Sequence, residues 1–209
     1  MPDRPEIRAR MLFELLEFLG PDREAQLRAH PEAGAAVDCV RGAPTNAWLD
    51  VDVDAKLSQG MVDLWGLDVA CELARRSAIQ SLQGPLLSPF VKGALQLFGV
   101  SPRALMRTAV RATHAAVRHL GSLEAVDTEV DGDFDLVWTQ APDIAFDDVV
   151  WRTTFIAALE SVFDLTKQSC STDVVVVDDV ERRLVVRFHW NKEPFETTSA
   201  PSRSSASRS

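Results

Sequence analysis

Apolar residues recur at helical spacing in the first part of the chain. Up to Gly20-Pro21 these positions are Ile7, Met11, Leu12, Leu15, Leu16 and Leu19. A spacing of three and four residues places such side chains on one face of a helix, and a Gly-Pro pair ends it. The pattern therefore predicts one helix up to residue 20 and a second, short helix from Asp22 to His30.

Glycines and Ser-Pro pairs divide the chain that follows into further helices. The stops are Gly66, Gly84, Gly99 and Gly121. Ser88-Pro89 and Ser101-Pro102 each combine a good N-cap with a good first helical residue. The predicted helices cover residues 54–65, 69–83, 90–98 and 102–120, and residues 32–44 are predicted to be irregular or weakly helical. Short connections between these helices indicate a compact helical half over residues 4–120.

Three aspartates alternate in residues 45–56, at Asp50, Asp52 and Asp54. The spacing resembles a calcium loop, but Ala55 and Met61 occupy the places where an EF-hand needs Gly and Glu. We therefore expect an extended segment in which Trp48 packs inward and one aspartate caps the next helix.

After Gly121 the period of the pattern changes from helical to alternating. Strands are predicted over residues 122–130 and 133–140 around the hairpin turn Asp131-Gly132, and over 174–177 and 184–190 after a helix at 146–167. In the last strand one face carries Leu184, Val186, Phe188 and Trp190. The fold class is thus α+β, with residues 122–190 forming a β-β-α-β-β unit and a four-stranded antiparallel sheet. We expect one domain over residues 1–193 and a disordered Ser/Arg tail over 194–209.

Composition narrows the classes of partner. The net charge is −9, from 31 acidic and 22 basic residues, which argues against binding to nucleic acid or to an anionic membrane. No apolar run approaches the roughly 18 residues of a membrane span. Cys39, Cys71 and Cys170 lie far apart and in no metal-binding spacing, so we expect neither a disulfide framework nor a metal site. Together these features favour a cytoplasmic location.

The predicted helix at 102–120 carries a basic stripe. Its members on one face are Arg103, Arg107, Arg111 and Arg118, with His114 between them. No acidic residue lies on this helix, so the stripe is a candidate docking surface for an acidic partner or for the phosphates of a small ligand. The alternative, which carries more weight, is a solvated helix face.

The order of these elements resembles the superfamily of haem nitric-oxide-binding and 4-vinyl reductase domains. The resemblance rests on Trp48–Val51, Gly99–Pro102 and Val185–Trp190, and more narrowly the chain is similar to a myxobacterial paralogous family. It implies a ligand enclosed between the helical half and the sheet. The candidate pocket residues are Trp48, Trp65, His114, Trp138 and Trp151. Core packing is the alternative for most of these aromatic residues.

Haem is the cofactor that the resemblance suggests. In the haem-binding branch a His on the long helix ligates the iron, and His114 resembles it, while a Tyr-x-Ser-x-Arg motif clamps the propionates. Residues 136–142 lack that motif, and the chain contains no Tyr. We therefore expect no cofactor and disfavour haem, and we keep a haem or other tetrapyrrole sensor using His114 as the alternative. The 4-vinyl reductase branch often carries a cysteine cluster, and only Cys170 falls in the equivalent half.

Catalytic motifs are missing from the sequence. No GxSxG, P-loop, GxGxxG, HExxH or Cys-His pairing occurs, so we predict no catalytic residues and no enzyme activity. The leading hypothesis is a non-enzymatic regulatory or signalling module. It would act through a protein partner, with an acidic partner as a candidate, or through a small apolar ligand held between helices and sheet, and a homodimer is left open.

Overall fold

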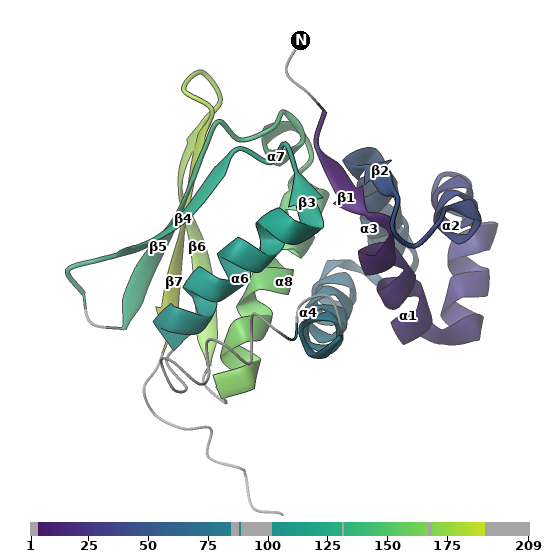
Figure 1. The fold of residues 1–209 in the computed structure, drawn as a ribbon, viewed down its shortest axis with the longest axis horizontal. Helices are drawn as coiled ribbons and strands as arrows, with labels where there is room; N and C mark the ends of the chain where they lie inside the picture. The colour runs from purple at the N-terminus through teal and green to yellow at the C-terminus, as the bar shows by residue number, and fades with distance from the viewer. Residues whose placement is uncertain (1–3, 85–87, 89–101, 131, 167–168, 191–209) are drawn as a thin grey trace, which may run out of the picture.

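The computed structural model describes residues 4–84, 88, 102–130, 132–166 and 169–190 (Figure 1). The first half contains β1 (Glu6–Arg8), α1 (Ala9–Ala29), α2 (Ala33–Gly42), β2 (Trp48–Asp50), α3 (Val51–Trp65) and α4 (Leu67–Gln83). The second contains α6 (Pro102–Ala116), β3 (Val117–Arg118), β4 (Ser122–Asp127), β5 (Asp133–Thr139), α7 (Ile144–Asp147), α8 (Val149–Thr166), β6 (Cys170–Asp178) and β7 (Arg183–Trp190). The predicted α+β class, with a helical half followed by a β-β-α-β-β unit, is confirmed. The predicted helix at 90–98, residue Asp131 and the tail at 194–209 lie outside the described residues.

The predicted break at Gly20-Pro21 is a kink inside α1. Gly20 has a φ of 75°, a conformation that glycine adopts without strain, and the helix resumes at Pro21. The apolar stripe of the first segment is buried in the core. The next predicted cap is also present, because Asp50 Oδ1 accepts a hydrogen bond from the backbone N–H of Asp52 at 3.0 Å, at the start of α3.

Residues 33–42 form a regular helix, α2, where the sequence predicted irregular or weakly helical chain. Its stripe consists of small residues that are fully or nearly fully buried: Ala33, Ala36, Val37 and Val40. Small side chains allow a close approach to α3, where a Cβ added at Gly60 would lie only 2.5 Å from Cβ of Ala33. The packing of α2 against α1 and α3 therefore stabilises a helix whose own sequence pattern is weak.

The long central helix ends at Ala116, earlier than predicted, and the chain enters β3. In β3, Val117 pairs with Ile7 of β1, which also pairs with Leu49 of β2, giving an antiparallel sheet in the order β2-β1-β3. Strands of two or three residues have no readable period, and β1 and β3 are far apart in the sequence. This small sheet joins the start of the helical half to the end of α6.

The four-stranded antiparallel sheet has the order β4-β5-β7-β6. Phe134, Leu136 and Trp138 of β5 are almost completely buried and alternate with residues that are less buried. On the predicted apolar face of β7, Leu184, Val186 and Phe188 are buried and Trp190 is partly buried, and Arg187 on the other face pairs with Asp135 at 2.7 Å. Figure 1 shows α6 and α8 lying along one face of this sheet, with α4 beyond them and α1 to α3 on the far side.

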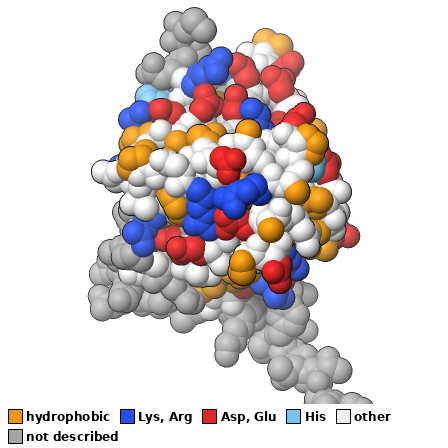
Figure 2. Space-filling view, turned by 90° about the vertical axis from the view of Figure 1, so that its right-hand side faces the viewer, with side chains coloured by type: hydrophobic (Ala, Val, Ile, Leu, Met, Phe, Trp, Pro, Cys, Tyr) orange, Lys and Arg blue, Asp and Glu red, His pale blue; other side chains and the backbone are white. Residues whose placement is uncertain are grey.

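The helical end of the molecule has a mixed surface. Figure 2, which looks onto the side where α1 and α2 lie, shows basic, acidic and hydrophobic side chains interspersed. On α1 and α2, Arg28 pairs with Asp38 at 2.9 Å and Arg41 pairs with Glu24 at 2.5 Å. Among the described helices, none combines the length and the apolar character that a membrane span requires.

Candidate functional site

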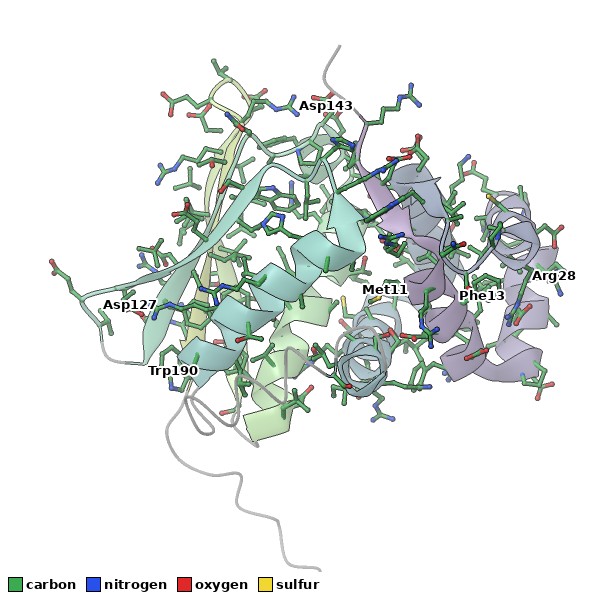
Figure 3. All side chains as sticks on the ribbon, viewed as in Figure 1. Met11, Phe13, Arg28, Asp127, Asp143 and Trp190 are labelled. Atoms are coloured by element: carbon green, nitrogen blue, oxygen red, sulfur yellow. The ribbon has the colours of Figure 1, made fainter. Side chains whose placement is uncertain are left out.

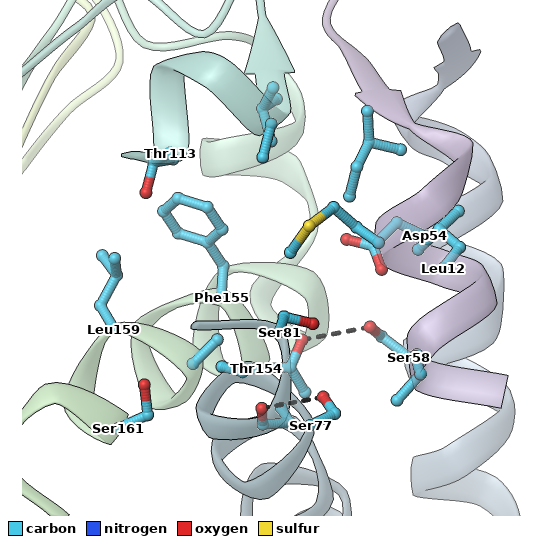
Figure 4. Close-up of a pocket in the computed structure, with 18 of the residues that line it drawn as sticks. Leu12, Asp54, Ser58, Ser77, Ser81, Thr113, Thr154, Phe155, Leu159 and Ser161 are labelled. Atoms are coloured by element: carbon cyan, nitrogen blue, oxygen red, sulfur yellow. Dashed lines mark hydrogen bonds between the residues drawn. The ribbon is translucent and has the colours of Figure 1, made fainter. Parts of the chain in front are cut away.

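A pocket lies between the helical half and the layer formed by α6 and α8, and we call it the helical pocket (Figure 4). Its volume is about 160 Å³, and its walls come from β1, α1, α3 and α4 on one side and from α6, β3 and α8 on the other. Apolar side chains such as Met11, Met61 and Phe155 form most of the lining. None of the described lining residues comes from the four-stranded sheet, so α6 and α8 separate the pocket from that sheet.

Hydroxyl groups interrupt the apolar lining. They belong to Ser58, Ser77, Ser81, Thr113, Thr154 and Ser161 (Figure 4). The Thr154 and Ser58 hydroxyls lie 3.2 Å apart, and Thr113 donates to the carbonyl of Ala109 at 2.9 Å. Ser161 differs, because its Oγ is buried and has no hydrogen-bond partner among the described residues. A buried hydroxyl without a partner is uncommon in a native core, and here it borders a space that a ligand could enter.

Asp54 is the one ionisable side chain among the described residues that line the pocket. Its Oδ2 accepts a hydrogen bond from Nε1 of Trp151 at 2.8 Å. Burial raises the pKa of this carboxyl to about 6; the nearby charge of Asp148 also raises it, and the Trp151 hydrogen bond lowers it. Oδ1 of Asp54 has no hydrogen-bond partner among the described residues. The pocket therefore has a single charged end in an otherwise neutral lining.

The five candidate pocket residues from the sequence occupy different places. Trp151 lines the helical pocket, and Trp138 lies behind it, with ring centroids 6.2 Å apart. Trp48 lies on β2, and the guanidinium carbon of Arg8 is 3.9 Å from the centroid of its ring. Trp65 donates its Nε1 proton to Oε1 of Gln26 at 2.9 Å, and neither ring is part of the lining.

His114, the candidate haem ligand, is exposed on α6 and does not line the pocket. The neighbouring Thr113 does, because one residue of helix rotation separates the two side chains by about 100°. The remaining histidines, His30, His119 and His189, are likewise absent from the described lining.

The basic stripe is partly engaged within the chain. Nη2 of Arg107 lies 2.9 Å from Oδ2 of Asp127, at the end of β4 (Figure 3). Arg118 pairs with Glu6 of β1, whose pKa it holds below the ordinary value through their hydrogen bond, and its guanidinium also lies over the ring of Trp48. Arg111 is exposed and has no ion-pair partner among the described residues. The side chain of Arg103 lies outside the described residues.

Sequence reasoning missed Asp54 as a pocket residue. The sequence predicted an extended segment in which one of the three aspartates caps the next helix, whereas Val51, Asp54, Ser58 and Met61 follow one another at helical spacing. That spacing puts Asp54 on the face of α3 that also carries Val51, Ser58 and Met61, and this was the available signal. Ser161 carried no comparable signal, since serine is common on both faces of helices.

Comparisons with known proteins identify the fold. No protein-family model matches the sequence, and no curated protein is significantly similar to it. Solved structures do match. The Fe(II) unliganded H-NOX protein from K. algicida is 10% identical with a TM-score of 0.59, covering 90% of this chain and 98% of that one. An oxygen-binding H-NOX domain related to soluble guanylate cyclases, in its oxygen complex, is 13% identical with a TM-score of 0.56, covering 90% and 96%.

A third match bears on the cofactor. It is a structure from work on heme distortion in the H-NOX family, 14% identical with a TM-score of 0.54, covering 90% of this chain and 96% of that one. The prediction that no cofactor is expected, with haem disfavoured, is thereby corrected, because structures that share this fold are described by their iron or heme. The missing motif could not decide the point, since a haem site depends on the axial ligand and the whole surrounding pocket. The predicted resemblance in fold is confirmed: the chain has the H-NOX fold.

Proposed function

We propose that this chain is a non-enzymatic sensor or regulatory module in which a small ligand in the helical pocket controls a contact with a partner protein. The observation that carries the proposal is an apolar pocket between the two layers of an H-NOX fold, bordered by the Ser161 hydroxyl, which has no hydrogen-bond partner among the described residues. Its volume of about 160 Å³ is close to that of an engineered apolar cavity, roughly 150 Å³, that takes up benzene or xenon. A benzene-sized molecule is therefore the first ligand to test.

The walls of the pocket make it suited to sensing. A bound molecule would touch α1, α3 and α4 on one side and α6 and α8 on the other. Its affinity would then depend on the spacing between these two groups of helices, and by linkage its binding would bias that spacing. The outer side of α6, which carries Arg107, Arg111 and His114, is the surface we propose for contact with an acidic partner.

Haem is the second candidate ligand, because solved structures with this fold are described by heme or Fe(II). The described lining does not fit a His-ligated haem as it stands, since it contains no histidine and the pocket lies below the roughly 300 Å³ at which ordinary cofactor sites begin. Met11 and Met61 are the described lining groups of a type that ligates haem iron.

Calorimetric titration with toluene tests the small-ligand proposal. We expect saturable binding with a dissociation constant on the order of 1 mM, as the few atoms of toluene allow. Ala112→Leu, which adds bulk to the pocket wall on α6, should abolish binding. Ala115→Leu, on the same helix and outside the described lining, is the matched control and should bind as the wild type does. Absence of toluene binding to the wild type, or equal loss in both variants, would refute the proposal.

Titration with haemin tests the second candidate. His114→Ala should leave any Soret band unchanged, because that imidazole is exposed and outside the pocket. A Soret band that Ala112→Leu and Met61→Leu both abolish would place haem in the helical pocket and favour haem over the small apolar ligand. A band lost in His114→Ala would instead support the ligand that the family resemblance implied.

A further inference from the structure

We propose that the ligand of the helical pocket is a small amine, with its apolar body among the apolar side chains and its ammonium group on the carboxylate of Asp54. This inference rests on the proposed function, because it presupposes that the pocket holds a small ligand. It adds the chemical class of that ligand and the residue that selects it.

The charge of the pocket points to a cation. Asp54 is the one ionisable group in the described lining, and no basic side chain faces it there. One carboxylate oxygen receives the Trp151 indole N–H at 2.8 Å, which leaves Oδ1 for another donor. A half-buried carboxylate in a mainly apolar lining is stabilised when it is paired and hydrogen-bonded, so an ammonium group would supply the charge partner that the described lining does not.

The surroundings of Asp54 discriminate between ligand classes. Asp148, at the start of α8, is the neighbouring charge that acts on Asp54, and it makes the site more negative. An anionic ligand would be repelled, and a neutral hydrocarbon would leave the carboxylate unpaired. Ser58, one helical turn after Asp54 on α3, adds a hydroxyl that can accept a second ammonium proton.

The protonation of Asp54 gives the binding a pH dependence. Burial and the charge of Asp148 raise the pKa of this carboxyl and the Trp151 hydrogen bond lowers it, which together give a pKa of about 6, so the group is largely ionised near pH 8. An alkyl ammonium, like that of lysine, also keeps its charge near pH 8. The residues that face Asp54 from β1, α1, α4 and α6 within the described lining do not titrate. Amine binding should therefore weaken as the pH falls through about 6, and toluene binding should not.

The test compares benzylamine with toluene, which has the same ring without the ammonium group, by calorimetry near pH 8. We expect benzylamine to bind about tenfold more tightly than toluene, as a charge-assisted hydrogen bond allows. Asp54→Asn keeps the shape and an oxygen that can accept the Trp151 proton, and it should remove the preference while toluene still binds. Asp52→Asn, two residues away on the exposed side of α3, controls for the loss of one negative charge and should keep the preference.

Each outcome has a distinct meaning. If neither compound binds the wild type, the proposed function fails and this inference fails with it. If toluene binds and benzylamine binds no more tightly, or if the preference survives in Asp54→Asn, only this inference is overturned. Benzyl alcohol binding as tightly as benzylamine would overturn the requirement for charge. Should Asp54→Asn not fold, the wild-type pH profile decides instead: a benzylamine affinity that stays constant from near pH 8 to near pH 5 overturns the inference.

Discussion

The two sides of helix α8 are packed in opposite ways. Toward the sheet, Phe163 stacks with Phe134 and Phe188, each at a centroid distance of 6.0 Å, and all three rings are at most 1% exposed. Toward the helical half, the same helix presents Phe155 and Ser161 to a pocket of about 160 Å³. One side of a single helix thus contributes to a filled core, and the other borders space.

This difference separates the part of the molecule that holds the fold together from the part that we propose binds a ligand. A filled aromatic core gains dispersion contacts on every side, whereas atoms next to an empty space have no partners there. Space in a core lowers stability, so a protein that keeps it forgoes stability that a larger side chain would provide. We therefore expect substitutions on the pocket side of α8 to affect ligand binding and substitutions on its sheet side to destabilise the fold.

The largest expected effect comes from truncating one phenylalanine in each of the two environments of α8, the filled core and the pocket. Phe188→Ala should lower the free energy of unfolding by about 3 to 5 kcal/mol, because the ring is fully enclosed. Phe155→Ala should cost at least about 1 kcal/mol less, since one side of its ring already faces the pocket. Denaturant unfolding of the two variants measures the difference. Equal costs would mean that the pocket is packed like the core.

The second effect concerns the charge at the pocket end. Burial raises the pKa of Asp54 from 3.8 to about 6, so the folded state holds this proton more tightly than the unfolded chain does. As the pH rises from near 4 to near 6, ionisation of Asp54 should lower the free energy of unfolding of the wild type by roughly 2 to 3 kcal/mol. Asp54→Asn, which has no carboxyl at this position, should not show this loss. Unfolding free energies of both proteins across this range measure it. A difference between them that does not change with pH would show that the carboxyl is well solvated.

A smaller effect is expected from filling the pocket. Ala112→Leu should raise the free energy of unfolding by about 1 kcal/mol, as filling of a true void does, while it blocks ligand binding. Ala115→Leu provides the comparison from outside the described lining. Thermal unfolding in the absence of ligand is the measurement. A loss of stability of about 1 to 3 kcal/mol in Ala112→Leu would indicate overpacking and hence no usable space.

Much of the fold followed from the sequence because its elements are long and periodic. The change from helical to alternating spacing after Gly121 located the β-β-α-β-β unit, and residues 184–190 showed which face of β7 is buried. The sheet of β1, β2 and β3 could not be predicted, since its strands are too short to show a period. Helix α2 was missed because its buried face consists of alanines and valines, whose helical character depends on the packing of α1 and α3.

The site was less predictable than the fold. The sequence predicted four tryptophans as pocket residues, yet of these only Trp151 belongs to the described lining. Much of the wall consists of Ala, Ser and Thr, which leave space because they are small and which give no distinctive signal. Whether space remains beside a helix depends on how elements from distant parts of the chain meet, as α1, α4 and α8 do here.

The smallest expected effect concerns the side of the α6–α8 layer that faces solvent, in addition to its core side and its pocket side. Arg111 is exposed on α6 without an ion-pair partner among the described residues, whereas Arg107 pairs with Asp127 at 2.9 Å. Arg107→Ala should cost about 0.2 to 1 kcal/mol of stability, the usual value of an exposed pair, and Arg111→Glu should change stability less.

Arg111→Glu should nevertheless weaken binding to an acidic peptide, because it reverses a charge that is available for contact. Fluorescence anisotropy with a labelled oligoglutamate peptide measures this, and Arg183→Glu, exposed on β7, is the matched charge reversal. If both variants weaken peptide binding equally, the effect comes from the change in net charge alone, and the proposal that α6 carries the contact surface is wrong. Toluene binding should stay unchanged in Arg111→Glu, since the pocket lies on the other side of the helix. If it is lost as well, the pocket and the solvent face of α6 are not separate surfaces, and the contrast between a binding side and a structural side would have to include the whole helix.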